Sequence, residues 1–198
     1  MEIAVLILVF LVTVTFHEVA HGFVANALGD PTAKQEGRLT LNPLKHIDIL
    51  WTILFPLMLI KLGLPAIGMA KPVPVNFGNL HRPKRDMIWV ALAGPAINLL
   101  LAWGLSWLFL YTGWWGWLVG VYFNLGLAVF NLLPIPPLDG SRILTGLLPL
   151  ALAREYVKIE RVGFIIVIAL VWMGWLWRII FPAMNFFCRV LGIPPIGH

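Results

Sequence analysis

The chain has 198 residues, of which 60% are hydrophobic and only 12% are charged. A soluble domain is typically about 45–50% apolar and about 25% charged, so this composition excludes an ordinary water-soluble globular protein. The net charge of +5 comes from basic residues that lie between apolar runs, which is typical of membrane orientation and not of a nucleic-acid-binding surface. We therefore expect a protein whose solvent is a lipid bilayer and which has no nucleic-acid partner.

Four apolar segments are long enough to cross a bilayer, which takes about 20 residues of helix. The first runs from Ile3 to Leu28 and ends at Gly29-Asp30-Pro31, where glycine suits a helix cap and proline cannot continue the helix. The other three predicted spans are Met87–Tyr111, Trp114–Leu133 and Val162–Phe181.

A further apolar segment, Ile49–Met69, is interrupted by Pro56, Gly63 and Pro65. The basic loops at 30–49, 70–87 and 139–161 carry three, four and four Lys or Arg residues, and such loops stay on the cytoplasmic side. All three loops share that side only if Ile49–Met69 is re-entrant or interfacial. We therefore expect four full spans with the N-terminus outside, and a fifth full span remains the alternative.

Two short segments have an extended pattern. Gly37–Asn42 alternates in polarity like a strand, and Lys71–Asn76 is restricted by its prolines. An exposed strand edge could hold an unwound substrate by its backbone, and we favour Gly37–Asn42 because proline lacks an N–H group. The alternative is an ordinary interfacial loop.

Long linkers and internal repeats are absent from the sequence, so we expect one domain over residues 1–198, with a core at about 3–145 and C-terminal helices at 141–187. The predicted fold is an all-α polytopic membrane protein. It has four to six transmembrane helices and short membrane-associated strand or re-entrant elements.

The residues with the clearest chemical meaning are His17, Glu18 and His21 on the first span. Histidines four residues apart on a helix lie on one face, as shared metal coordination requires, and the adjacent glutamate can act as general base toward a water activated by the metal. Ionisable groups inside a span are costly and usually functional. The alternatives are an interfacial polar cluster without metal, and a metal site used for transport or regulation.

A catalytic zinc site needs a third protein ligand. Asp139 is the strongest candidate, because it follows a proline-broken helix end and lies on the same predicted side of the membrane as His21. An N-cap for a helix that starts near Ser141 is about equally compatible with its position. Glu155 or Glu160 would have to serve in a different metalloprotease class, but both lie in a basic loop.

Three motifs occur in order, each on its own span: the stretch 17–22 (HEVAHG), the stretch 94–98 (GPAIN) and the stretch 131–140 (NLLPIPPLDG). Together they resemble the site-2 protease family of intramembrane zinc metalloproteases, peptidase family M50. The resemblance covers roughly residues 3–145. Because no insert the size of a PDZ domain separates the motifs, we expect a compact form of the family.

The resemblance implies a role for each motif residue. His17, His21 and Asp139 match the ligands of one Zn²⁺ per chain, and Glu18 matches the catalytic base. Asn131 matches an asparagine thought to hold substrate backbone, and Asn98 matches one that shapes the site or contacts substrate. From the residues alone, interhelical hydrogen bonding explains Asn98 better, whereas for Asn131 the two readings are closer.

We therefore expect an intramembrane zinc metalloendopeptidase that hydrolyses peptide bonds within or next to transmembrane segments of membrane proteins. It would be an integral protein of a prokaryotic plasma membrane, with its active site toward the cytoplasm. The rivals are a zinc-binding scaffold without protease activity and a metal transporter. A transporter would be expected to show polar ligands along several spans and an internal repeat, which this sequence lacks.

Overall fold

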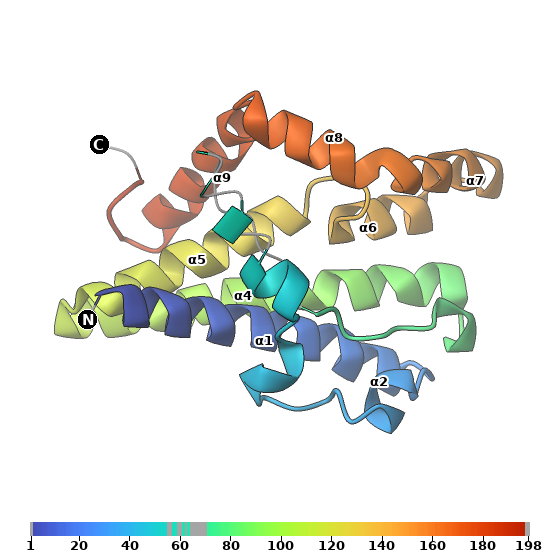
Figure 1. Ribbon diagram of the computed structural model, residues 1–198, viewed down its shortest axis with the longest axis horizontal. Coiled ribbons are helices and arrows are strands. Elements are labelled where there is room, and N and C mark those ends of the chain that lie inside the picture. Colours follow the sequence, from blue (N-terminus) through green and yellow to red (C-terminus); the bar gives the residue numbers. More distant parts are fainter. Residues whose placement is uncertain (1, 55–56, 59–60, 62, 64–70, 197–198) are drawn as a thin grey trace.

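A computed structural model of the chain describes residues 2–54, 57, 58, 61, 63 and 71–196. The described part is helical (Figure 1). Its α-helices are α1 (Glu2–Ala27), α2 (Thr32–Gln35), α4 (Pro83–Thr112), α5 (Trp115–Asn131), α6 (Asp139–Leu147), α7 (Leu150–Lys158), α8 (Glu160–Trp172) and α9 (Trp177–Val190). Two short 3₁₀ helices cover Pro43–His46 and Phe77–Asn79, and Ile49–Leu54 is a π-helix.

The long helix α4 is the centre of the packing. It packs against α1, α5 and α6, while α5 also contacts α1 and α9. Buried apolar side chains between α5, α8 and α9 form the larger core cluster, including Val121, Leu125, Val167 and Ile180. Residues from three distant parts of the sequence therefore meet along α4.

Within the described part of the chain, two helices are long and apolar enough to cross a membrane by length and composition, namely α1 and α4. Their 26 and 30 residues correspond to about 39 Å and about 45 Å of helix, more than the hydrocarbon core of about 30 Å. Both were predicted spans. The predicted span Trp114–Leu133 appears as the 17 residues of α5, or about 26 Å, which falls short of that thickness.

The predicted span Val162–Phe181 is not one continuous helix. The segment is divided between α8 and α9, which meet at an angle of 77° and form at most one broken span or a re-entrant element. Gly174 has φ +74°, and the Trp175 N–H donates to the Leu170 carbonyl, as in a Schellman helix end. The described residues therefore contain two candidate spans, or three with this bent pair, and the expected four to six are not confirmed.

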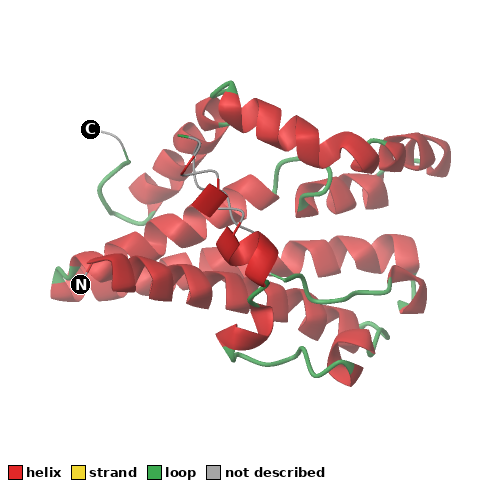
Figure 2. Cartoon of the chain, in the orientation of Figure 1, coloured by secondary structure: helices red, strands yellow, loops and turns green. Residues whose placement is uncertain are grey.

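The predicted strands are also absent from the described residues (Figure 2). Gly37 lies in a turn at φ +62°, and the Arg38 guanidinium donates to the carbonyls of Lys71 and Pro72. One side chain thus links the two extended segments. A ladder of backbone hydrogen bonds between them would need N–H groups at Pro72 and Pro74, and proline has none. Most of the re-entrant hairpin expected over Ile49–Met69 lies outside the described residues.

The end of α1 is fixed by a buried carboxylate. Asp30 has no exposed surface and accepts hydrogen bonds from the backbone of Asn76 (2.7 Å) and from the side-chain amide of Asn79 (2.9 Å). Burial alone would raise the pKa of Asp30, but these bonds and those from Thr32 hold the pKa below its usual value. The loop after residue 70 is thereby attached to the helix that carries the histidine motif.

We expect Asp30→Ala to lower the stability of the folded protein by about 1–3 kcal/mol, because buried N–H donors lose their acceptor. A carboxyl group whose folded pKa is depressed stabilises the protein above its unfolded pKa, and that contribution is lost as the pH falls. The difference in thermal midpoint from wild type in detergent should therefore be full at pH 7 and shrink below about pH 4. Glu36→Ala, which removes a nearby exposed carboxylate, is the control, and equal midpoints for Asp30→Ala and wild type would contradict this role.

Candidate metal centre

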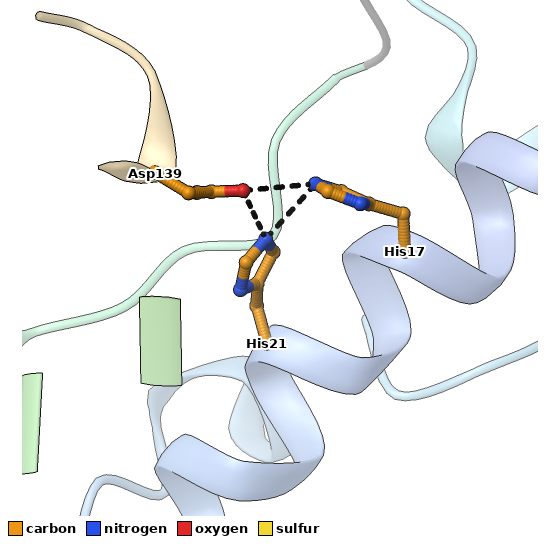
Figure 3. A group of neighbouring side chains, drawn as sticks. All are labelled: His17, His21 and Asp139. Carbon is orange, nitrogen blue, oxygen red and sulfur yellow. Dashed lines mark hydrogen bonds and ion pairs between the residues drawn. The ribbon is translucent and has the colours of Figure 1, made fainter. Parts of the chain in front are cut away.

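His17 and His21 lie one helical turn apart on α1 and are both buried (Figure 3). Their Nε2 atoms are 3.1 Å apart. The four-residue spacing places both rings on the face of α1 that packs against α4. The two Nε2 atoms therefore face each other across a short gap.

Asp139 brings a carboxylate to the same point from a different part of the chain. Its Oδ2 atom lies 3.2 Å from His17 Nε2 and 3.3 Å from His21 Nε2 (Figure 3). Asp139 is the first residue of α6, whose N-cap is Leu138, so the alternative of an N-cap carboxylate is wrong. The adjacent Gly140 permits this placement, since a Cβ atom there would lie 2.2 Å from the Leu132 carbonyl oxygen.

Hydrogen bonds at the other ring nitrogens orient both imidazoles. His21 Nδ1 lies 2.7 Å from the Val90 carbonyl oxygen, and His17 Nδ1 lies 2.6 Å from Asn98 Oδ1. A carbonyl oxygen can only accept, so His21 Nδ1 carries a proton and Nε2 of the neutral ring is left as an acceptor. Such a hydrogen bond is the usual support of a histidine that binds a metal.

The three convergent atoms fit a metal ion. Asp139 Oδ2 is buried and has no hydrogen-bond partner among the described residues, although two ring nitrogens are close to it. Three acceptors that face one another in a buried space repel, and a cation relieves that repulsion. Two imidazoles and one carboxylate are a ligand set that zinc commonly takes in catalytic sites, where a further position stays open.

Helix α4 approaches this group very closely at Gly94. A Cβ atom at this position would lie 2.4 Å from His21 Nε2 and 2.5 Å from His17 Cε1. Only glycine leaves room for both rings at this distance. Gly94 therefore forms a wall of the site.

Glu18 is not part of the three-residue group but lies beside it. Its partly buried carboxylate accepts a hydrogen bond from the Val73 N–H through Oε2 at 2.8 Å. Gly22 lets the loops cross α1 here, since a Cβ atom would lie 2.7 Å from side-chain atoms of Leu39 and Val73. The segment predicted to be a strand thus supplies a hydrogen-bond donor to the predicted base.

The two predicted asparagines occupy different environments. Asn98 on α4 is completely buried and bonds His17, whereas Asn131, the last residue of α5, is partly buried and donates to the Leu127 carbonyl. Sequence reasoning missed Asn124 on α5, which is buried and accepts a hydrogen bond from Asn98 at 2.8 Å. The available signal was an amide within an apolar span.

Neither glutamate of the rival ligand set reaches the site. Glu155 forms an ion pair with Lys158 at 2.6 Å, and Glu160 forms one with Arg142. Among the described residues, the group that could hold a metal consists of His17, His21 and Asp139.

The chain is similar in sequence to a family of known proteins. The family model described as peptidase family M50 matches residues 112–174. YwhC of Bacillus subtilis is 37% identical over 179 residues, covering 83% of this chain and 78% of YwhC. The Rip2 proteins of Mycolicibacterium smegmatis and Mycobacterium tuberculosis are 33% and 30% identical, covering 89% and 87% of this chain and 66% and 70% of the relatives. All three carry the name "putative zinc metalloprotease", and no solved structure gives a significant match.

The fold and the site define a helical membrane protein with a buried centre of two histidines and one carboxylate. The chain belongs to peptidase family M50, the site-2 protease family whose motifs its sequence carries.

We expect Gly94→Ala to abolish metal binding or weaken it by at least about tenfold, because the new methyl group occupies the space of both imidazoles. Gly104→Ala on the same helix is the matched control, since nothing lies within 4 Å of a Cβ atom there. Metal per chain in purified, detergent-solubilised protein measures both. Wild-type metal content in Gly94→Ala would show that α4 does not border the site.

Proposed function

We propose that the chain is an intramembrane zinc metalloprotease that hydrolyses peptide bonds within or next to transmembrane segments of membrane proteins. The group of two buried histidines, His17 and His21, and the partly buried Asp139, on and beside a helix long enough to span the bilayer, carries this proposal. Membership of a peptidase family and the names of the relatives support it.

His17, His21 and Asp139 would hold one zinc ion per chain. Bound zinc supplies a Lewis acid, which polarises the scissile carbonyl group and makes water a better nucleophile. The protein contributes two imidazoles whose rings are fixed by Val90 and Asn98, and a carboxylate fixed at the start of α6. These supports keep the ligand atoms together before the metal arrives.

Glu18 acts as the general base. It takes a proton from the attacking water and later delivers a proton to the leaving amine, so that peptide hydrolysis is balanced. The Val73 N–H donates a hydrogen bond to one carboxylate oxygen of Glu18. A hydrogen bond of this kind restricts the rotamers of Glu18, which favours a single productive geometry.

The asparagines differ in their proposed parts. Asn131 remains the residue we propose to hold substrate backbone, because it is partly buried at the end of α5. Asn98 has no exposed surface and its amide is already bonded on both sides, so direct substrate contact does not suit it. We assign Asn98 to the orientation of His17.

The position of the histidines on α1 suggests on which side of the membrane the site lies. His17 and His21 lie in the C-terminal half of α1, close to basic loops that favour the cytoplasmic side. We therefore place the site toward the cytoplasmic face of a prokaryotic plasma membrane. Its partners are the lipid bilayer and a membrane-protein substrate.

We expect Glu18→Gln to keep its zinc and to lose at least about a hundredfold in cleavage rate, because the amide cannot accept the proton of water. Zinc per chain and the cleavage of a panel of tagged single-span membrane proteins in detergent are measured on the same preparations. Glu36→Gln, which changes an exposed carboxylate near the site, is the control and should retain both. Normal cleavage by Glu18→Gln would refute the assigned base and would favour a catalytic group elsewhere.

A further inference from the structure

A line of buried polar side chains lies behind His17, on the side away from the metal centre. It runs from His17 to Asn98 on α4, then to Asn124 on α5 and to Thr13 on α1. We propose that Asn124 is a positioning residue that fixes the proton of His17 on Nδ1 and so keeps Nε2 as a metal-binding acceptor. The inference rests on the proposed zinc site. It gives a role to Asn124, which contacts neither the metal nor an atom that would bind the metal.

A backbone carbonyl fixes the orientation of the Asn124 amide. Asn124 Nδ2 lies 2.8 Å from the Gly120 carbonyl oxygen one turn earlier on α5, and 3.0 Å from Thr13 Oγ1. A carbonyl oxygen can only accept a hydrogen bond, so the NH₂ group of Asn124 must face Gly120. The Oδ1 atom of Asn124 must then face the opposite way, toward Asn98.

The orientation of Asn124 determines that of Asn98. The two amides are 2.8 Å apart, from Asn98 Nδ2 to Asn124 Oδ1. If the Asn98 amide were reversed, two oxygens would face each other at this distance, and its NH₂ group would point at His17. The observed orientation leaves Asn98 Oδ1 against His17 Nδ1 at 2.6 Å.

The orientation of Asn98 in turn determines the His17 tautomer. An amide oxygen accepts only, so His17 Nδ1 must be the donor, and Nε2 of the neutral ring keeps its lone pair. His21 differs because the Val90 carbonyl accepts from its Nδ1 directly. A side-chain amide can exchange its oxygen and nitrogen by rotating 180°, whereas a backbone carbonyl cannot. Of the two histidines, only His17 therefore needs a further residue to fix its tautomer.

Burial makes this dependence strict. Asn98, Asn124 and Thr13 are 0%, 2% and 2% exposed, so water has no ready access to replace a missing partner. Buried amide groups that lose a hydrogen bond rearrange to recover one. In Asn124→Leu, the Asn98 NH₂ group keeps only the Thr13 backbone carbonyl as acceptor, and at 3.5 Å that hydrogen bond is long and weak. Reversal of the amide would give the NH₂ group His17 Nδ1 as acceptor. The proton of His17 then moves to Nε2, which can no longer bind metal.

We therefore expect Asn124→Leu to weaken zinc affinity by about 10–100-fold, the usual cost of losing an outer hydrogen-bond partner. Affinity is measured by competition with a chelator in detergent. The tautomer is read separately from ¹⁵N chemical shifts of His17 in metal-free protein with labelled histidine. Ser106→Ala is the matched control, because Ser106 is also buried on α4 but donates to the Trp103 carbonyl, outside this line.

A rescue variant separates positioning from a loss of packing. In Asn98→Asp, both carboxylate oxygens accept, so His17 keeps its proton on Nδ1 whichever way the carboxylate turns. We expect Asn98→Asp/Asn124→Leu to bind zinc as tightly as Asn98→Asp alone, although Asn124→Leu alone is weak. A merely structural loss at Asn124 would persist in the double variant.

The outcomes distinguish this inference from the proposed function. Wild-type affinity with His17 protonated on Nδ1 in Asn124→Leu would overturn it, and so would a double variant as weak as Asn124→Leu. A wild-type protein without zinc would instead refute the proposed zinc site. In that case the ¹⁵N shifts of metal-free wild type and Asn124→Leu would still decide whether Asn124 controls the tautomer.

Discussion

Three electron-pair acceptors meet in the apolar interior of this protein: the Nε2 atoms of His17 and His21 and the Oδ2 atom of Asp139, separated by 3.1, 3.2 and 3.3 Å. Such a group is unfavourable without a cation, because the low-dielectric surroundings strengthen every repulsion within it. The rest of the structure is arranged to keep the group together. Gly94 lets α4 approach both rings, and Gly140 lets α6 begin against the end of α5.

Helices α4 and α5 pack around the histidines and also provide the hydrogen bonds that orient their rings. Helix α4 presents the Val90 carbonyl to one ring and the Asn98 amide to the other, while α5 stabilises that amide through Asn124. The loop after residue 70 is held by Asp30 at the end of α1 and gives the Val73 N–H to Glu18. The proposed ligand histidines are therefore oriented by contacts between helices, and the proposed base is held by the loop after residue 70.

The chemistry could be predicted from the sequence better than the architecture. The four-residue spacing of His17 and His21 is a local property of any helix, and the stretch 131–140 identified Asp139. Asn124 had no such signature, because its partner Thr13 lies 111 residues away and an amide in an apolar span has no periodic pattern. The expected last span is not one continuous helix, and hydropathy gives no sign of the left-handed turn at Gly174 that breaks it. The expected strands failed because Arg38 satisfies the carbonyls of the neighbouring segment.

The proposed zinc site needs α1 and α6 to hold one zinc ion jointly. This is tested by zinc per chain in detergent-solubilised wild type and in Asp139→Ala, after expression with sufficient metal. We expect about one zinc per chain in wild type and clear loss in the variant, because two histidines alone leave a catalytic zinc site one ligand short. Full zinc in Asp139→Ala, or none in wild type, would contradict it.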